Sequence, residues 1–578
     1  MTYTFPSAVY PESVLDELEK EIKKAVLPKY GYNRNTPNAV VYGHSEFAGV
    51  EMRKLNVEQG IGQLYYLLMS LRADGVSRDL AQIAISWAQL LAGTSISIFS
   101  DTETKLPHLD PMKWLPAIRD FLASMKCTLE MDKNYIPELQ RENDLFLMDV
   151  ALKEKYKPNQ IKLINACRIY KGVTLLSDVV NAKGNKIRED MMNQEKPQDD
   201  HKGLMPYQDL PSTNAWELWK RLLHTFTYHK SERLTSPMGR WFVSGELCHR
   251  QWRSYHCQKD DIVFIWKNKE YEIYTKNNNE FIYSKTTVKQ IPSSCVPVDL
   301  DLSQPRITRR SSSTVYPKFA TCNPTNFESY IATLPTWEQA LLQNIEFQED
   351  IFQFSEYLQS STDTPGIWIY ATSDGSAPEF IGSFGWACKL SNGQFVAKNN
   401  GPAHGFRTTS FRAESYGLLS YLLLLRRACC YTQCPLPSKV RLHSDSKSAL
   451  EKILDMITWP YYYPNATMSP DWDVLQAIVS LLREFPKTPQ LIHVKGHQDN
   501  NQTYAQLSMP AQLNVDADKL AGDFEYRPSD DPTIAPLIAG NSVSLQCPTG
   551  TISSKYRQNI RKMKSAPIMK QHICQNNL

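Results

Sequence analysis

A regular succession of strand-like and helix-like patterns between residues 366 and 521 constrains the fold of this 578-residue chain more than any other feature. The Asn-Gly pair at 392–393 is typical of a tight hairpin turn between two strands. The order is β, β, β, α, β, α, β, α, with β-rich runs at 366–370, 381–387, 393–397, 440–443 and 491–494 and helical patterns through 418–425, 449–453 and 514–521. The succession predicts an α/β domain with a mixed five-stranded sheet and flanking helices.

Four carboxylates stand at defined points of this succession. Asp374 and Asp445 come at the ends of strands, and Glu414 and Asp518 fall in the first turns of helices. We expect this layout to gather all four at one edge of the sheet. Because their mutual repulsion is costly unless hard cations neutralise it, and because oxygen ligands suit such cations, the pattern predicts Mg²⁺ or Mn²⁺ as the cofactor.

The motifs around these carboxylates resemble the type 1 ribonuclease H family over residues 362–525. They are Asp-Gly-Ser at 374–376, Arg-Ala-Glu at 412–414, Ser-Asp-Ser at 444–446, Val-Lys-Gly-His at 494–497 and Asn-Val-Asp-Ala-Asp at 514–518. The resemblance implies an RNase H-like fold and an endonuclease that hydrolyses the RNA strand of an RNA–DNA hybrid with two divalent metal ions. It implies that Asp374, Glu414, Asp445 and Asp518 bind the metals.

Other residues take roles from the same resemblance. His497 corresponds to a mobile histidine that aids product release or proton transfer, and Asn514 corresponds to a residue four positions before the last carboxylate. Ser376, Arg412 and Asn514 are the candidate substrate-binding residues. For the grip on the DNA phosphates, the candidates are Arg407, Thr408, Thr409, Arg412 and the basic stretch 555–570.

The interval between His497 and Asp518 is longer than in compact members of the family, because residues 500–510 form an insert. Asp516 is therefore a rival for the fourth metal ligand. We favour Asp518, since Asn514 and Asp518 share a helix face at i, i+4 whereas Asp516 points elsewhere.

The flanking sequence carries a second resemblance, to the region after the polymerase palm in retroelement reverse transcriptases. It rests on segments such as 27–31, 35–37, 58–60 and 167–178. The Asp-Asp pairs of the chain lack the aromatic residue that a polymerase turn requires, so we expect a C-terminal fragment without a polymerase. The predicted division is a helical, thumb-like region at 1–175, a connection region with a small β meander at 176–300, a linker with helices at 301–361, the nuclease at 362–525 and a basic polar tail at 526–578.

Composition narrows the class of protein further. A net charge of +3 neither requires nor excludes nucleic acid, so a phosphate-binding surface has to be a local patch. The longest apolar run, 418–425, is too short to span a bilayer, and no secretory signal is evident. The spacing of the cysteines favours reduced thiols. We therefore expect an intracellular protein of the cytoplasm or nucleus, without a membrane partner. Two alternatives stay open, a DNA transposase or integrase of the same fold and an inactive nucleic-acid-binding remnant, and the oligomeric state is undetermined.

Overall fold

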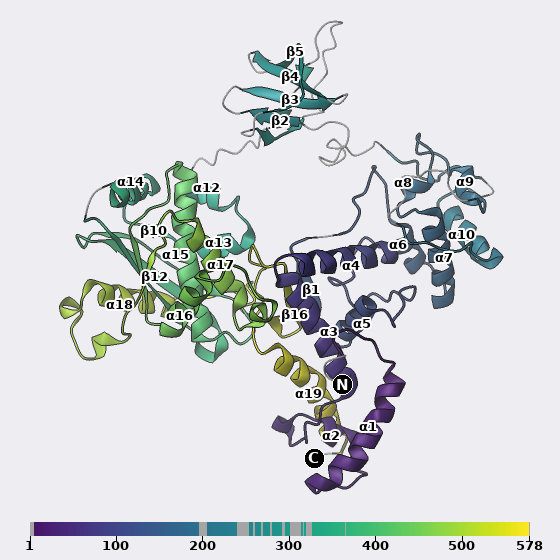
Figure 1. Cartoon of the computed structure of the whole chain (residues 1–578), viewed down its shortest axis with the longest axis horizontal. Coiled ribbons are helices and arrows are strands. Elements are labelled where there is room, and N and C mark those ends of the chain that lie inside the picture. Colours follow the sequence, from purple (N-terminus) through teal and green to yellow (C-terminus); the bar gives the residue numbers. More distant parts are fainter. Residues whose placement is uncertain are drawn as a thin grey trace. The chain divides into compact units, whose positions relative to one another are not determined.

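The structure is a computed structural model of the whole chain, and its parts are labelled in Figure 1. It describes residues 5–576 except 134, 196–204, 230, 240–253, 258–260, 268–269, 278–279, 292–294, 301–313, 316, 319–325 and 364–365. Residues 301–313, 316 and 319–325 of the segment expected to contain the linker, 301–361, therefore lie outside the described residues. The chain divides into two compact units, one made of Met1–Ile136, Met148–Ile169 and Asn326–Leu578 and the other of Pro137–Leu147 and Tyr170–Thr325.

A mixed sheet forms the centre of the predicted nuclease domain. Its strand order is β10-β13-β12-β11-β14-β15, with antiparallel pairing from β10 to β11 and parallel pairing from β11 through β14 to β15. The strands are β10 (Glu346–Phe347), β11 (Ile369–Ser376), β12 (Gly382–Leu390), β13 (Phe395–Ala403), β14 (Val440–Ser444) and β15 (Gln490–His493). The antiparallel meander and the two parallel strands match the predicted succession. The expected count of five strands was wrong, because the two-residue β10 from the preceding segment adds a sixth.

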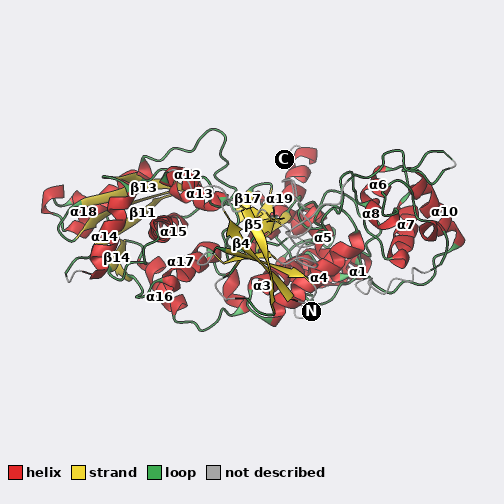
Figure 2. Ribbon diagram, turned by 90° about the horizontal axis from the view of Figure 1, so that it is seen from above, coloured by secondary structure: helices red, strands yellow, loops and turns green. Residues whose placement is uncertain are grey.

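Helices cover both faces of this sheet (Figure 2). Trp386 of β12 packs its indole against Tyr421 of α15, whereas a side chain at the neighbouring Gly385 would point at the backbone of Ala517 in α18. Because successive residues of a strand face opposite sides, α15 and α18 lie on opposite faces. The helices of this domain are α12 (Phe327–Ile331), α13 (Thr336–Leu342), α14 (Ile351–Asp363), α15 (Ser410–Thr432), α16 (Lys447–Ile457), α17 (Trp472–Glu484) and α18 (Met509–Gly522).

The core of the domain is built around α15. Every residue of this helix from 415 to 425 is buried, which explains its apolar run, since a helix that is hydrophobic on all sides belongs in a core. Helices α13, α14 and α17 pack against it. Helix α18 begins at Met509 rather than at the expected residue 514, with Pro510 in its first turn, where proline costs no hydrogen bond.

The N-terminal part of the same unit is mainly helical. A buried cluster that includes Leu64, Leu68, Ile85 and Ile118 joins three of its helices. The helices before residue 172 are α1 (Glu12–Val26), α2 (Asn38–Tyr42), α3 (Leu55–Arg72), α4 (Val76–Ala92), α5 (Trp114–Ala123), α6 (Leu147–Lys153) and α7 (Pro158–Lys171). None of the helices in the described ranges combines the length and the apolarity that a bilayer crossing needs.

The segment after residue 525 differs from the expected polar tail. It contains β16 (Val543–Cys547), β17 (Gly550–Ile552) and α19 (Tyr556–Asn576), and β16 pairs with β1 (Thr128–Met131) of the helical part. Val543, Leu545 and Ile552 are buried in the same cluster as the N-terminal helices. Two of the cations in 555–570 also have carboxylate partners, because Arg561 pairs with Glu58 and Lys562 with Glu46.

The second unit contains short helices and an antiparallel β meander. Residues 145–147 belong to it rather than to the first unit, since backbone hydrogen bonds join Leu147 to Thr174 and Leu176 to Leu145. Its larger sheet has the order β6-β2-β3-β4-β5-β8. The elements are α8 (Leu176–Val179), α9 (Glu189–Met192), α10 (Thr213–His224), β2 (Ser254–Cys257), β3 (Ile262–Lys267), β4 (Glu270–Asn277), β5 (Glu280–Val288), β6 (Val296–Pro297), β7 (Asp299–Leu300), β8 (Thr314–Val315) and β9 (Pro317–Lys318).

Candidate active site

Parallel pairing of β11 and β14 brings the first two carboxylates together. Ser373 stands beside Ser444 in the register, so the residues that follow them, Asp374 and Asp445, are neighbours at one edge of the sheet. Strand β15 continues this edge, because Val494 donates its backbone N–H to Ser444. The carboxyl ends of two parallel strands therefore bring these side chains to one edge of the sheet.

A glycine allows the third carboxylate to approach. A Cβ atom at Gly375 would lie 2.3 Å from the backbone nitrogen of Glu414, which is closer than real Cβ contacts come. The absence of a side chain at this position lets the start of α15 lie directly against β11. Glu414 thereby comes beside Asp374.

Oxygen atoms of Asp374, Glu414 and Asp445 all lie within 4.8 Å of one another. Burial and the nearby charge of Asp445 raise the pKa of Asp374 to about 7. The same two causes raise the pKa of Glu414, and burial raises the pKa of Asp445. The three groups are therefore held close at an energetic cost that protonation relieves, and that a bound cation would relieve as well.

Polar neighbours orient this cluster. Asp374 accepts hydrogen bonds from the backbone N–H of Gly375 at 2.7 Å and from the side-chain amide of Asn514 at 3.3 Å. Ser444 donates its hydroxyl to Glu414 at 3.2 Å. One oxygen of Asp445, Oδ1, is buried without a hydrogen-bond partner among the described residues. An unpaired buried carboxylate oxygen is costly, so this atom is suited to a ligand.

The two candidates for the fourth carboxylate have different surroundings. Asp518 is exposed on α18, and its charge contributes to the raised pKa of both Asp374 and Asp445. Asp516 instead accepts a hydrogen bond from the hydroxyl of Tyr504 at 2.8 Å and lies 3.9 Å from the ammonium group of Lys389. Asp518 therefore borders the cluster, whereas Asp516 is engaged with the insert.

His497 lies at the same edge in an exposed turn. Its backbone has φ 50°, and its charge influences the pKa values of Asp374 and Asp445, which it lowers. A Cβ atom at the preceding Gly496 would lie 2.5 Å from Oδ2 of Asp445. The loop that carries the histidine is thus closely seated on the carboxylate cluster.

Two of the three predicted substrate-binding residues are not surface groups. Arg412 is 1% exposed, and its guanidinium contacts Asp473, Asp471, Tyr416 and the carbonyl of His404. It therefore has no donor left for a phosphate, and the expectation of a phosphate contact was wrong. Asn514 is 4% exposed and holds Asp374, whereas Ser376 is partly exposed at the end of β11.

Sequence reasoning missed the residues that hold Arg412, because they lie far from it along the chain. Asp471 and Asp473, at the start of α17, hold Arg412 two residues before Glu414. Ser553 in the C-terminal segment donates its hydroxyl to Asp471 at 3.0 Å. A pairing across 59 residues leaves no periodic signal in the sequence. The single available signal was the Asp-Trp-Asp triplet itself.

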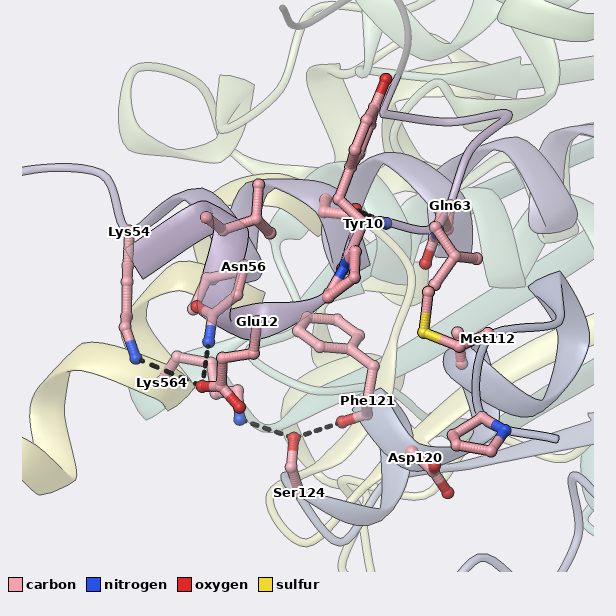
Figure 3. Close-up of a pocket in the computed structure, with 18 of the residues that line it drawn as sticks. Tyr10, Glu12, Lys54, Asn56, Gln63, Met112, Asp120, Phe121, Ser124 and Lys564 are labelled. Carbon is pink, nitrogen blue, oxygen red and sulfur yellow. Dashed lines mark hydrogen bonds and ion pairs between the residues drawn. The ribbon is translucent and has the colours of Figure 1, made fainter. Parts of the chain in front are cut away.

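A pocket of about 660 Å³ in the N-terminal part is separate from this site (Figure 3). It is lined by residues of α1, α3, α5 and α19 and includes none of the four carboxylates. Some of its polar groups are paired, since Asn56 donates to Glu12 at 2.9 Å and Lys564 donates to Ser124 at 2.5 Å (Figure 3). Among the described residues, the group of carboxylates that could hold a metal ion is Asp374, Glu414 and Asp445, and none of the three lines this pocket.

The solved structures reported next are similar to part of the chain. No protein-family model matches it, and no curated protein matches it. Among solved structures, the N-terminal RNase H domain of Rv2228c from Mycobacterium tuberculosis is similar at 16% identity and a TM-score of 0.19, over 27% of this chain and 93% of that one. RNase H1 from the halophilic archaeon Halobacterium salinarum is similar at 19% identity and a TM-score of 0.18, over 27% of this chain and 98% of that one.

Proposed function

We propose that this chain is a metal-dependent endonuclease that hydrolyses the RNA strand of RNA–DNA hybrids. The observation that carries the proposal is the convergence of Asp374, Glu414 and Asp445 within 4.8 Å at the carboxyl edge of the sheet, with Asp518 beside them. Carboxylates with raised pKa values in a shared site are typical of catalytic centres.

The donor set fits a hard divalent cation. All the converging ligands are carboxylate oxygens, which suit Mg²⁺ or Mn²⁺ and not softer metals. The buried Oδ1 of Asp445, unpartnered among the described residues, supplies a lone pair that is otherwise unsatisfied. Bound cations of this kind activate water and stabilise the leaving oxygen of a phosphodiester. Asp374, Glu414, Asp445 and Asp518 are the residues that would hold them.

The protein groups around the cluster have separate tasks in this proposal. Gly375 and Asn514 keep Asp374 in one orientation through two hydrogen bonds, so the carboxylate needs no rearrangement when a cation binds. His497 is exposed at the edge of the cluster, where its imidazole can reach the solvent and exchange protons with the product phosphate.

The substrate contacts are assigned from exposure. The RNA strand of a hybrid presents 2′-hydroxyls across a wide minor groove, and Ser376 is a partly exposed hydroxyl next to Asp374. Arg407 is exposed in the loop before α15, and its guanidinium stacks 4.5 Å from the ring centroid of Phe380. Because Arg412 is buried, Arg407 takes over the proposed contact with a DNA phosphate.

The flanking regions extend the proposal to a retroelement context. The motifs at 27–31, 35–37 and 58–60 support a chain that belongs to a retrotransposon-derived protein with a reverse-transcriptase region. In that setting the hybrid arises from reverse transcription, and the nuclease removes its RNA strand.

The decisive experiment is cleavage of labelled substrates by the purified full-length protein. With Mg²⁺ or Mn²⁺, we expect cutting of the RNA in a hybrid to give 5′-phosphate and 3′-hydroxyl ends, with RNA duplex and DNA duplex left intact. Asp445→Asn should abolish cleavage, whereas the exposed Asp499→Asn should not. Equal cutting of DNA duplex would support the transposase or integrase class, and binding without metal-dependent cleavage would support an inactive remnant.

A further inference from the structure

Two cysteines far apart in the sequence face each other across neighbouring strands. The sulfur atoms of Cys127 and Cys547 are 2.7 Å apart, although 420 positions separate the residues in the chain. Cys127 immediately precedes β1, and Cys547 is the last residue of β16, its antiparallel partner. The register pairs Thr128 with Gln546, so one further step places the two cysteines opposite each other.

Both backbones are fixed in these positions. Cys127 donates its N–H to Leu122 at the end of α5 and accepts a hydrogen bond from the hydroxyl of Thr102 at 2.9 Å. Cys547 is held between two strands, since it pairs with Gly550 of β17 on its other side. Opposed residues of an antiparallel pair have Cα atoms about 4.5–5.5 Å apart, which lies within the range that a disulfide bridges. A covalent bond needs only a small shift of the two side chains.

We propose that Cys127 and Cys547 form a reversible disulfide when the protein meets a hydroperoxide, and that this bond fastens the C-terminal segment to the helical part. Residue Cys547 is partly exposed and Cys127 is fully buried, so Cys547 reacts first. This inference is independent of the nuclease proposal. It also departs from the expectation of reduced thiols, because sequence spacing contains no sign of a pair so far apart.

The reaction balances in two steps. The Cys547 thiolate attacks one oxygen of the hydroperoxide, the O–O bond breaks, and the leaving oxygen takes up a proton to form water or an alcohol. The Cys127 sulfur then attacks the sulfur of the resulting sulfenic acid, the S–O bond breaks, and a second water leaves with the Cys127 proton. Two thiols are oxidised, one peroxide is reduced, and an added dithiol reverses the bond by exchange.

The contact with Cys127 and burial raise the pKa of the Cys547 thiol. Because the thiolate is the reacting form, oxidation should be slow at neutral pH and should accelerate as the pH rises. The bond would close a loop of 420 positions and join β16, β17 and α19 to β1. Restricting the unfolded chain in this way stabilises the folded form, so the oxidised protein should unfold at a higher temperature.

The test uses the reduced full-length protein treated with hydrogen peroxide, followed by alkylation of the remaining thiols and peptide mapping. We expect a cross-linked peptide pair that contains Cys127 and Cys547. Each chain should lose two titratable thiols, and its mass should show no added oxygen atom. The melting temperature should rise, and a dithiol should reverse the rise. Cys547→Ser should lose the cross-link and the rise. The exposed Cys430→Ser should keep both.

A second pair of cysteines could form a disulfide instead, and this provides a control for the mapping. Cys429 and Cys434 also interact through their side chains at the end of α15. If mapping finds only a bond between those two residues, or finds Cys547 as a stable sulfenic acid while Cys127 remains a thiol, the proposal is overturned. Mapping of the unmodified sequence decides this even where a serine variant folds poorly.

Discussion

The guanidinium of Arg412 and the carboxylate of Asp473 form a two-pronged ion pair, with nitrogen–oxygen distances of 2.8 and 2.7 Å. Arg412 is buried at the start of α15, and a second carboxylate, Asp471, lies 3.1 Å from the same guanidinium. Since Glu414 follows two residues later on α15, this pairing fixes the turn of helix that presents Glu414 to the site. The ion pair thus links the packing of α17 to the geometry of the acidic cluster.

Replacing Arg412 by Met should therefore be costly to stability. The methionine fills much of the space but leaves the buried Asp471 and the largely buried Asp473 without their cation, and loss of one partner of a buried pair typically costs about 3–5 kcal/mol. The free energy of unfolding, measured by urea denaturation, should fall by this amount. Lys447→Met is the matched control, because its pair with Glu451 is exposed and worth about 0–1 kcal/mol. Similar losses in both variants would contradict a structural role for Arg412.

The acidic cluster should make the metal-free protein less stable as the pH rises. The pKa of Asp374 is raised from 3.8 to about 7, so the folded state holds this proton more tightly than the unfolded chain. Its contribution to stability is fully present below pH about 4 and disappears as the pH passes about 7. Melting temperatures measured in EDTA should show this decline, and Mg²⁺ should remove most of it by binding the charged form.

Asp445→Asn tests the cause of that decline. The charge of Asp445 is the second-largest contribution to the raised pKa of both Asp374 and Glu414. Without it, the metal-free protein should be more stable at pH 8 than the unmodified protein, while cleavage is lost. Asp499→Asn, at an exposed position, should change neither quantity. An Asp445→Asn protein that melts earlier at pH 8 would indicate a structural hydrogen-bond network and not a metal site.

The local patterns of the proposed nuclease domain were readable from sequence because most of its strands and helices show their own periodicity. The predicted turn at Gly393, for example, has φ 89°, which glycine adopts without strain. Strand β10 escaped notice because two residues carry no alternation. The start of α18 was placed late because the polar insert with Pro510 resembles a loop, although Pro510 lies in the first turn of the helix.

The remaining differences between the predicted and the observed structure come from contacts between residues far apart in the sequence. β16 is short, and it pairs with β1, more than 400 positions earlier, and is buried in the same cluster as the N-terminal helices. The sequence around it therefore looks like a polar tail. Arg412 likewise looks like a surface cation, since nothing near it in the sequence reveals Asp471 and Asp473. Single-sequence patterns report local structure, whereas these partners are set by tertiary packing.

Deleting residues 526–578 should unfold much of the helical part, and not simply weaken binding to nucleic acid. The deletion removes Leu545 and Ile552 from a core and takes away Val543 and Tyr556, which accept hydrogen bonds from the buried Arg72. We expect loss of helical circular dichroism and a large drop in melting temperature. Removal of residues 574–578 alone is the control and should be neutral. A stable deletion protein with a flatter salt dependence of hybrid binding would instead favour α19 as a phosphate-binding element.

Gly496→Ala should impair cleavage far more than folding. The new methyl group would lie 2.5 Å from Oδ2 of Asp445, so either the carboxylate or the loop that carries His497 has to move. Initial cleavage rates should fall while the melting temperature changes little, because residue 496 is in a partly exposed turn. Gly522→Ala is the control, since no atom lies within 4 Å of its added methyl group. Equal rates for both alanine variants would show that the loop adapts without cost.

The identity of the fourth carboxylate can be decided by comparing Asp516→Asn with Asp518→Asn. Asp518 is exposed beside the cluster, and its charge raises the pKa values of Asp374 and Asp445. Loss of a group that only orients a metal ligand typically lowers activity by roughly 10–100-fold. If Asp518 itself helps to hold a cation, Asp518→Asn should lower the cleavage rate by more than this. The Mg²⁺ concentration needed for half-maximal rate should rise as well.

Asp516→Asn should behave differently because of its surroundings. The asparagine retains an oxygen that can accept the hydrogen bond from Tyr504, and the partner charge of Lys389 is 3.9 Å away, so the stability cost should stay below about 1 kcal/mol. Cleavage rate and Mg²⁺ requirement should remain close to those of the unmodified protein. Mg²⁺ titrations of both variants on the same labelled hybrid provide the measurement. An inactive Asp516→Asn protein together with an active Asp518→Asn protein would reverse the assignment and would mean that α18 turns its other face to the cluster when a cation binds.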